Sequence, residues 1–242
     1  MISATLTDVG IVRQENQDSV FYCDERVGIL PNLYIIADGM GGHRAGEVAS
    51  SSAIQAFVEN VKNTGLKDIL SVLQESIVAA NAFLMEMSME TKAYEGLGTT
   101  MVVAVVDENL VYIANVGDSR LYLVNEEIKQ ITRDHSLVQE MINLGELDKK
   151  SARSHKNKNV ITKAVGTDIN LTADFFDIEI NNDDILLMCS DGLTNMIDDR
   201  GIHEIIKAEE VFASKAERLV DKANENGGKD NISVILIKKG RF

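Results

Sequence analysis

The sequence has 242 residues, of which 45% are hydrophobic and 26% are charged, which is enough material for a proper core and an ordinary globular balance. Its formal net charge is −14. A chain this acidic is a poor candidate for binding nucleic acid or an anionic membrane through a basic face, so we expect neither partner. The two cysteines, Cys23 and Cys189, form no metal-ligand spacing and suit buried reduced thiols in a cytoplasmic protein.

The first predicted elements are short strands at about residues 2–9 and 19–23, joined by a polar loop that carries Arg13 and Asp18. The next apolar run, 33–37, is short and β-branched, which is typical of a strand buried on both faces. It ends at Asp38, which three glycines follow within four positions. A carboxylate in so bare a turn is costly unless a cation or a donor meets it. The alternative is that Asp38 only caps the next helix.

Two helices and a run of strands follow. Apolar residues at helical spacing predict helices over 45–62 and 66–87. Strands are expected at 99–106, 110–116, 121–124 and 128–131. The short turns between these strands predict an antiparallel meander.

The segment 133–168 is irregular, with a short helix near 137–144, and it is either a lid beside a site or a tolerated surface insertion. The predicted elements that come after it are strands at 173–180 and 184–189, helices at 199–208 and 212–224, and a last strand at 232–237. No apolar run approaches the length of a membrane span, and no linker divides the chain. We therefore expect one domain, residues 1–242.

Four aspartates lie at strand ends beside glycine, and such a recurrence predicts carboxylates that converge at one edge of a sheet core. They are Asp38, Asp118, Asp191 and Asp230. Converged carboxylates repel one another unless cations lie between them, and hard oxygen ligands favour Mg²⁺ or Mn²⁺. A metal pair could activate a bridging water and hold a phosphoryl oxygen, with Arg13 as a planar fork for phosphate.

Other catalytic schemes find little support. No cysteine has an arginine six residues later, and neither a nucleophile elbow nor a Walker motif occurs. The best rival is the run 117–121, which faintly resembles the Gly-Asp-Ser block of some lipases and would make Ser119 the nucleophile of an esterase.

Taken together, the motifs resemble those of the metal-dependent protein Ser/Thr phosphatases, the protein phosphatase 2C (PPM) family, in their compact bacterial form. The resemblance spans nearly the whole chain in order: Arg13 and Asp18, Asp38 to His43, Gly98 to Thr100, Val116 to Arg120, Ile161 to Gly166, Ser190 to Leu193, and Asp230 to Ser233.

The resemblance implies an α+β fold, a four-layer α-β-β-α sandwich of two packed antiparallel sheets, each flanked by helices. It also implies hydrolysis of phosphoserine and phosphothreonine by a water bridging two metal ions, without a phosphoenzyme. The implied partners are phosphorylated Ser/Thr proteins and a bacterial Ser/Thr kinase that the enzyme opposes. We expect a cytoplasmic monomer.

By matching position, the resemblance assigns the metal ligands. Asp38 would bridge two ions, the Gly39 carbonyl and waters would complete the second, and Asp191 with Asp230 would hold the first. Asp118 with Asp191 would hold a weaker third ion.

The remaining implied roles lie around these ligands. Asp18 would act through bound waters, and Arg13 would bind the substrate phosphate. Residues of about 145–166 would form a flap beside the site. A catalytically silent relative that only binds phosphoproteins is a further alternative, against which the intact aspartate set argues.

One departure from the family pattern concerns the general acid. Eukaryotic relatives carry histidine directly after the Asp-Gly pair, where this chain has Met40. His43 could substitute, a metal-bound water could serve, or His43 could be a helix-start residue without a chemical role. Gln17 stands where some relatives have glutamate, which weakens the case for a water-mediated metal contact there. The other three histidines, at 135, 155 and 203, are expected to have no chemical role.

Overall fold

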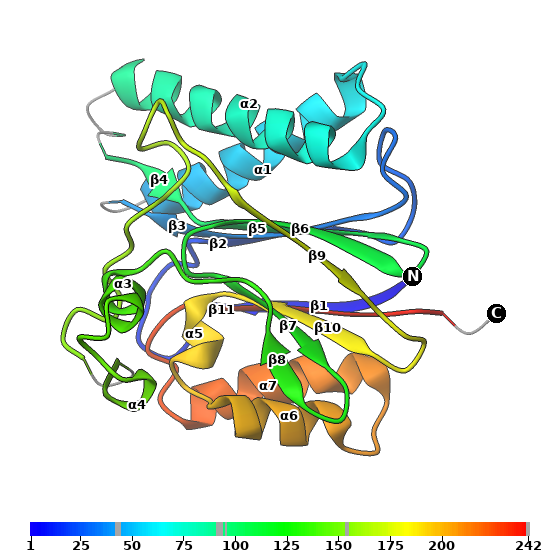
Figure 1. The fold of residues 1–242 in the computed structure, drawn as a ribbon. Coiled ribbons are helices and arrows are strands. Elements are labelled where there is room, and N and C mark those ends of the chain that lie inside the picture. Colours follow the sequence, from blue (N-terminus) through cyan, green and yellow to red (C-terminus); the bar gives the residue numbers. More distant parts are fainter. Residues whose placement is uncertain (42–44, 91–93, 95, 153–154, 241–242) are drawn as a thin grey trace.

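The chain forms two antiparallel β-sheets that pack face to face, with helices on the outer face of each (Figure 1). The computed structural model describes residues 1–41, 45–90, 94, 96–152 and 155–240. The first sheet has the strand order β1-β11-β10-β7-β8. Its strands are β1 (Ile2–Asp8), β7 (Arg120–Val124), β8 (Ile128–Gln130), β10 (Ile185–Cys189) and β11 (Ile232–Lys238).

The second sheet has the order β2-β3-β5-β6-β9, with the two-residue strand β4 paired to β3. Its strands are β2 (Asp18–Cys23), β3 (Leu33–Met40), β4 (Gly98–Thr99), β5 (Met101–Asp107), β6 (Leu110–Val116) and β9 (Asp174–Glu179). These two sheets confirm the predicted α+β sandwich.

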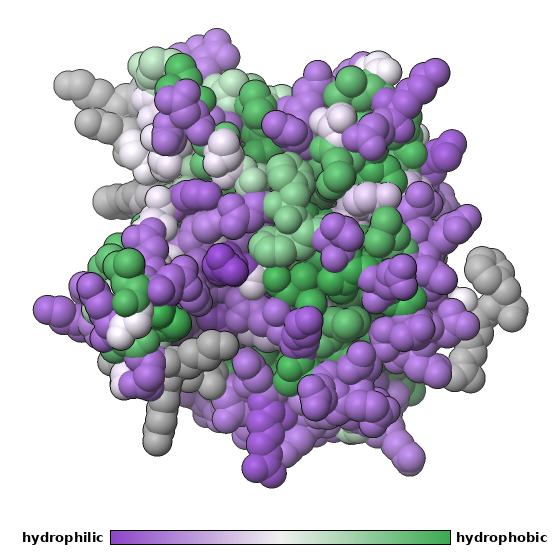
Figure 2. All heavy atoms as spheres, viewed as in Figure 1, coloured by the Kyte–Doolittle hydropathy of each residue, from purple (hydrophilic) through white to green (hydrophobic). Residues whose placement is uncertain are grey.

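Seven helices among the described residues complete the layers. Helices α1 (Ala45–Asn63) and α2 (Ile69–Glu90) cover the second sheet, and α6 (Asp199–Lys207) and α7 (Phe212–Glu225) cover the first, with the single turn of α5 (Asp191–Thr194) next to them (Figure 1). Two short helices, α3 (Leu137–Asn143) and α4 (Lys149–Ala152), lie beside one end of the sandwich. Polar side chains dominate the lower part of the face in Figure 2, while apolar ones gather toward its middle.

Alternation along β3 explains why its apolar run is continuous. Leu33, Ile35 and Ala37 point into the core beneath α1 and α2, whereas Tyr34 and Ile36 point into the core between the two sheets. Because successive side chains of a strand face opposite sides, a strand between two cores has no polar face. The predicted strand buried on both faces is therefore confirmed.

The predicted meander is wrong at one turn. Strands β5 and β6 pair with each other, and so do β7 and β8, but β6 and β7 belong to different sheets. The short connection 117–119 carries the chain across the sandwich instead of reversing it within one sheet. A turn length alone cannot distinguish these outcomes, because which face each strand buries is decided by packing.

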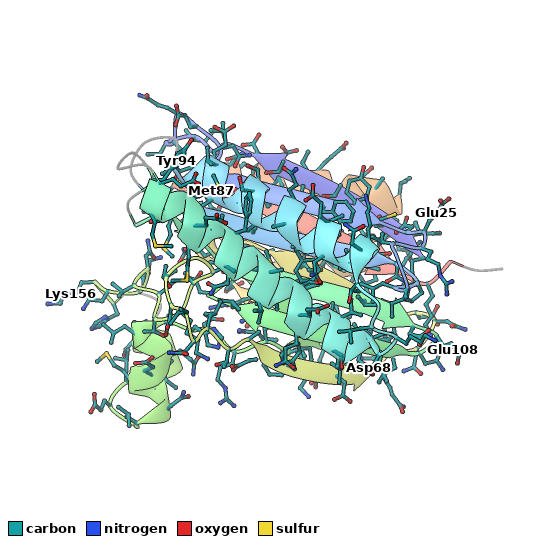
Figure 3. All side chains as sticks on the ribbon, turned by 90° about the horizontal axis from the view of Figure 1, so that it is seen from above. Glu25, Asp68, Met87, Tyr94, Glu108 and Lys156 are labelled. Carbon is teal, nitrogen blue, oxygen red and sulfur yellow. The ribbon has the colours of Figure 1, made fainter. Side chains whose placement is uncertain are left out.

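Helix α2 also departs from expectation, because its length and composition suffice to cross a membrane. Its inner face packs against α1 and the second sheet through Val72, Leu73, Ile77 and Leu84, which are fully or almost fully buried. Figure 3, seen from above, shows α2 between the labelled Asp68 and Met87, alongside α1 and across the strands. A core helix of this kind passes the same test as a membrane span.

Candidate active site

Two aspartates from the second sheet face each other across neighbouring strands. The β2–β3 register places Asp18 directly opposite Asp38, so both side chains lie on one face of the sheet end. The backbone N–H of Asp38 donates to the Thr100 hydroxyl over 2.9 Å, and its carbonyl accepts from the N–H of Thr100 over 2.8 Å. The strand that carries Asp38 is therefore fixed up to its last residues.

The first sheet brings two more aspartates to the same end of the sandwich. Asp191 comes after β10, separated from it only by Ser190, and Asp230 precedes β11, separated from it only by Asn231; these strands are antiparallel neighbours. Ser190 joins the two sheets, because its hydroxyl donates to Oδ2 of Asp18 over 2.7 Å while its N–H donates to the Ser233 carbonyl over 3.1 Å. The carboxylates thus gather where the sheets meet.

The fifth aspartate, Asp118, lies in the connection between β6 and β7, at the point where the chain crosses from one sheet to the other. Its neighbour Gly117 has φ +102°, and a Cβ there would lie 2.6 Å from the Cβ of Thr100. Only glycine meets both conditions without strain. The close approach of this turn to Thr100 brings Asp118 toward the strand end that carries Asp38.

The electrostatics show that these carboxylates share one site. Burial raises the pKa of Asp38 well above its ordinary value, and the charges of the other four aspartates, at positions 18, 191, 118 and 230, raise it further. Burial and the charges of Asp191 and Asp134 likewise raise the pKa of Asp118 well above its ordinary range. Such mutual shifts arise where like charges lie close together away from water.

The pKa values of Asp18 and Asp191 are also raised, but nearby hydrogen bonds and positive charges oppose the rise. Burial raises the pKa of Asp18 to about 7, although hydrogen bonds from Ser190 and Ser233 oppose the shift. Burial and the charge of Asp230 raise the pKa of Asp191 to about 6, opposed by Lys158 among others. Perturbed carboxyls of this kind are typical of functional sites, and also of structural ion networks.

The donor set fits hard cations that keep part of their water shell. Oδ1 of Asp18 is buried without a hydrogen-bond partner, which leaves one acceptor facing inward. Among the described residues, however, no three carboxyl, imidazole or thiol groups are arranged to hold an ion by themselves. Carboxylate oxygens completed by waters are the coordination that Mg²⁺ accepts, so the residues fit the predicted class of metal.

Other carboxylate oxygens of the cluster accept hydrogen bonds from protein groups. Oδ2 of Asp230 pairs with the Arg13 guanidinium at 2.8 Å, and its Oδ1 accepts from the N–H of Asn231 at 2.9 Å. Oδ2 of Asp191 accepts from the Asn195 side chain at 2.8 Å. Arg13 is about half exposed, with 48% of its side chain accessible, so the predicted phosphate-binding group lies at the rim of the cluster.

Close backbone approach explains two glycines of the site. A Cβ at Gly39 would lie 1.9 Å from the Gly46 carbonyl oxygen, and a Cβ at Gly192 would lie 1.9 Å from the Asn231 carbonyl oxygen. Asn231 itself accepts from the Gln17 N–H and donates to two backbone carbonyls of the loop between β1 and β2. The side chain of Asn231 therefore fixes this loop against the start of β11.

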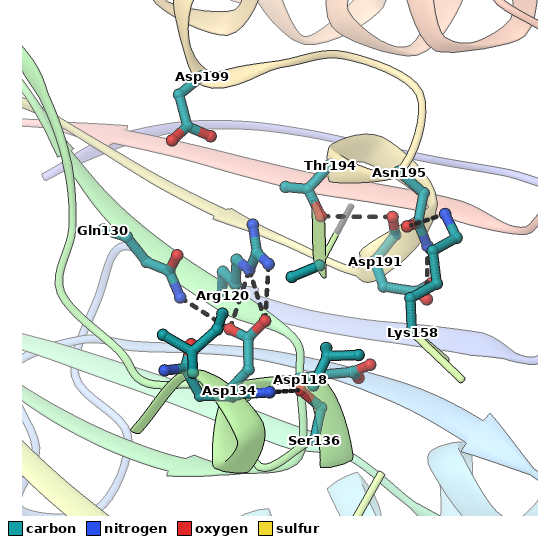
Figure 4. A pocket seen from close by; sticks show the side chains of 14 residues that line it. Asp118, Arg120, Gln130, Asp134, Ser136, Lys158, Asp191, Thr194, Asn195 and Asp199 are labelled. Atoms are coloured by element: carbon teal, nitrogen blue, oxygen red, sulfur yellow. Dashed lines mark hydrogen bonds and ion pairs between the residues drawn. The ribbon is translucent and has the colours of Figure 1, made fainter. Parts of the chain in front are cut away.

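A cavity of about 430 Å³ opens beside the cluster, and Figure 4 shows Asp118 and Asp191 on its wall. A partly buried ion pair, Arg120 with Asp134, forms another part of the wall. Further lining residues come from α3, from α4 and from Lys158, whose ammonium donates to Asn195 over 2.6 Å beside Asp191 (Figure 4). The segment beside the site therefore begins at α3, earlier than the predicted flap of about 145–166.

The structure excludes Ser119 as an esterase nucleophile. Its side chain is fully buried, and its hydroxyl lies 2.8 Å from the Thr100 hydroxyl in the interior. A nucleophile must reach its substrate, and this one contacts only the core. His43 lies outside the described residues, so its predicted role as general acid stays a prediction.

Sequence reasoning missed the polar residues that hold the aspartates. Thr100, Ser190 and Asn195 were given no role, yet each donates to or accepts from an aspartate of the cluster. For Thr100 and Ser190 the available signal was their place in the motif runs Gly98 to Thr100 and Ser190 to Leu193, and for Asn195 it was its position four residues after Asp191.

Comparison with known proteins identifies the family. The family model described as protein phosphatase 2C matches residues 11–236. The chain belongs to the protein phosphatase 2C family. A serine/threonine phosphatase Stp of Listeria monocytogenes is 40% identical over 240 residues, which cover 96% of this chain and 94% of that protein.

Solved structures agree with this membership. The Streptococcus agalactiae serine/threonine phosphatase matches with a TM-score of 0.92 at 33% identity, covering 99% of each chain. The catalytic domain of PstP in complex with two manganese ions matches with a TM-score of 0.84 at 32% identity, covering 97% of this chain and 96% of that one. The predicted class, a protein serine/threonine phosphatase, is therefore confirmed, and neither the esterase nor the silent binding relative is supported.

Proposed function

We propose that this phosphatase hydrolyses phosphoserine and phosphothreonine in proteins with Mn²⁺ or Mg²⁺ held by its aspartate cluster. Asp38, Asp191, Asp230 and the Gly39 carbonyl are the proposed ligands of two ions, and Asp118 with Asp191 those of a weaker third. The observation that carries the proposal is the convergence of aspartates from both sheets at one end of the sandwich, where burial and their mutual charges raise the pKa values of Asp38 and Asp118. Cations relieve such a concentration of negative charge.

Asp18 supports the cluster from the side. Its Oδ1 is buried without a partner, while Ser190 holds the other oxygen, so one acceptor remains for a water of an ion's shell. When bound, ions of this kind supply an activated water and neutralise charge on the phosphoryl oxygens. The PstP catalytic domain, a structural relative, was solved in complex with two manganese ions, which supports the choice of metal.

Arg13 is the proposed phosphate-binding group. Its guanidinium is anchored to Asp230 through one NH₂ group, and much of the side chain is exposed at the rim. A guanidinium offers five donors in a planar fork, so contact with one carboxylate oxygen leaves others for a phosphate. Arg13 would hold the substrate phosphate against the cluster and orient it there.

The proposal extends to the cellular setting of the enzyme. Phosphorylated Ser/Thr proteins are the substrates of such an enzyme, and a Ser/Thr kinase is the enzyme that would supply them. The net charge of −14 and the free thiols of Cys23 and Cys189 favour a monomer in the reducing cytoplasm.

The test is hydrolysis of a phosphothreonine peptide by the purified protein with Mn²⁺, with Mg²⁺ and with an excess of chelator. We expect release of phosphate that depends on the metal and returns when Mn²⁺ is restored. Activity that survives complete chelation would overturn the proposal. Mn²⁺ counting by electron paramagnetic resonance on the same samples separates a failure of metal binding from a failure of catalysis.

A further inference from the structure

His135 is a buried histidine that contacts the turn carrying Asp118. Its side chain is 8% exposed. Its backbone N–H donates to the Gly117 carbonyl over 2.9 Å, and its ring Nδ1 accepts from the Gly117 N–H over 3.1 Å. One residue therefore holds both polar groups of Gly117. Because Nδ1 acts as an acceptor, the ring proton of neutral His135 is on Nε2.

The turn depends on such contacts, because glycine supplies no side chain of its own to hold it. Gly117 has a positive φ and packs directly on Thr100, while Asp118 is buried beside it at 8% exposure. The Asn115 amide also donates to the Gly117 carbonyl, over 3.2 Å. Among the described residues, the ring of His135 is the one side-chain group that accepts a hydrogen bond from the Gly117 N–H.

His135 also lies where the two ends of the flap meet. In the structure the flap is residues 136–152 and 155–161, which begins and ends earlier than the predicted segment of about 145–166. Ser136 pairs with Ile161 as an antiparallel bridge, and the N–H of Thr162 donates to the His135 carbonyl over 2.8 Å. A displacement of the flap therefore acts directly on the backbone of His135.

The remaining ring edge points to β9. Nε2 lies 3.2 Å from Oδ2 of Asp174, off the line of an ideal hydrogen bond, and the other oxygen of Asp174 lies 3.3 Å from the Lys163 ammonium. Lys163 follows the flap in sequence. The imidazole is thus held between β9 and the Gly117 turn, with the flap joined to its own peptide groups.

We propose that His135 is a positioning residue that couples the flap to the Gly117–Asp118 turn and so sets the affinity of the ion that Asp118 holds. The proposal rests on the proposed function, because it takes Asp118 as a ligand of the weakest ion. A histidine that only completes the core would stabilise the fold without a selective effect on one ion. Residues that orient metal ligands through a second layer of contacts change metal affinity by roughly 10–100-fold when replaced.

Replacing His135 by asparagine or by glutamine distinguishes a positioning role from a role in core packing alone. In His135→Asn the amide oxygen can take the place of Nδ1 and still accept from the Gly117 N–H, whereas in His135→Gln the amide reaches toward Asp174 instead. We expect the Gln variant to weaken the weakest Mn²⁺ site roughly tenfold, and the Asn variant to stay within about threefold of wild type. His203→Gln, on α6, is the matched control and should leave Mn²⁺ binding unchanged.

The measurement is Mn²⁺ binding, followed by the resonance signal of free Mn²⁺, together with thermal melting of each variant. If His135→Gln does not fold, Asp174→Ala leaves the ring in place but removes its support, and should weaken the same site about two- to threefold. Equal Mn²⁺ affinity in the Gln and Asn variants, or equal loss at every site, would overturn the proposal.

The variant Asp118→Asn separates a wrong role for His135 from a wrong assignment of Asp118 as a metal ligand. It should remove the weakest site, and adding His135→Gln to it should change the remaining sites no further. If Asp118→Asn removes a site but His135→Gln does not weaken it, the role of His135 is wrong and the metal assignment stands. If Asp118→Asn leaves all Mn²⁺ binding intact, the assignment of Asp118 is wrong, and the role of His135 falls with it.

Discussion

Replacing Asp18 by asparagine should stabilise the chelated protein at neutral pH while it impairs metal-dependent activity. Asp18 is buried at 6% exposure, one of its oxygens has no partner, and burial raises its pKa from the ordinary 3.8 to about 7. Asparagine keeps an oxygen to accept from Ser190 and removes the charge. The substitution therefore removes the buried negative charge of Asp18 and keeps the hydrogen bond from Ser190.

The sign follows from proton linkage. Because the folded-state pKa of Asp18 lies above the unfolded value, the folded state binds more protons between about pH 4 and 7. Its contribution to stability is complete below the unfolded pKa and is lost as pH rises through about 7. Since one pKa unit corresponds to about 1.4 kcal/mol, the difference between 3.8 and about 7 amounts to roughly 4 kcal/mol at most.

The assay is thermal melting in excess chelator at pH 5 and at pH 8. We expect Asp18→Asn to gain roughly 1–3 kcal/mol over wild type at pH 8, less than the full 4 because the other carboxyls readjust, and much less at pH 5. At about 2–4 °C per kcal/mol this is a clear shift for a domain of this size. Asp221→Asn, at an exposed position of α7, is the charge-matched control and should show no such gain. A variant that is less stable than wild type at pH 8 would refute the reasoning.

Three further predictions concern the same end of the sandwich. Asp38→Asn and Asp191→Asn should each lower phosphothreonine-peptide hydrolysis at least a hundredfold with an unchanged circular dichroism spectrum, and near-normal rates in either would contradict the ligand assignment. Gly192→Ala should destabilise by about 1–3 kcal/mol or more in urea unfolding, because the added methyl would meet the Asn231 carbonyl at 1.9 Å; an unchanged midpoint would mean that the turn is not closely packed. Ser119→Ala should keep substantial phosphatase activity and lose only about 1 kcal/mol of stability, and its inactivation would contradict the exclusion of Ser119 as a nucleophile.

The sequence supported the strands and their aspartates because both depend on local chemistry. Apolar runs such as Leu33–Ala37 predict buried strands, and a carboxylate that ends such a run beside glycine needs a partner wherever the chain goes. The structure brings these aspartates together where the two sheets meet. Their roles as metal ligands, and that of Arg13 toward phosphate, stay predictions until the experiments above are done.

What the sequence did not reveal depends on contacts between distant segments. The crossing at Gly117 looks like a hairpin turn, and only the packing of the glycine against Thr100 distinguishes the two. Helix α3 gave a helical pattern, but its place in the wall of the cavity follows from the bridge between Ser136 and Ile161. No periodicity within one segment carries that information.

Polar residues next to the aspartates hold the segments of this site together. Carboxylates that raise one another's pKa push the segments that carry them apart, so the segments must be tied by groups other than the carboxylates. Asn231 ties the start of β11 to the loop between β1 and β2 with three hydrogen bonds of 2.9 Å each, and Ser190 joins the two sheets with bonds to Asp18 and Ser233. Both adjoin a cluster aspartate in sequence. The polar residues beside Asp191 and Asp230 are therefore as important to the site as the aspartates, because their hydrogen bonds oppose the repulsion between the clustered carboxylates.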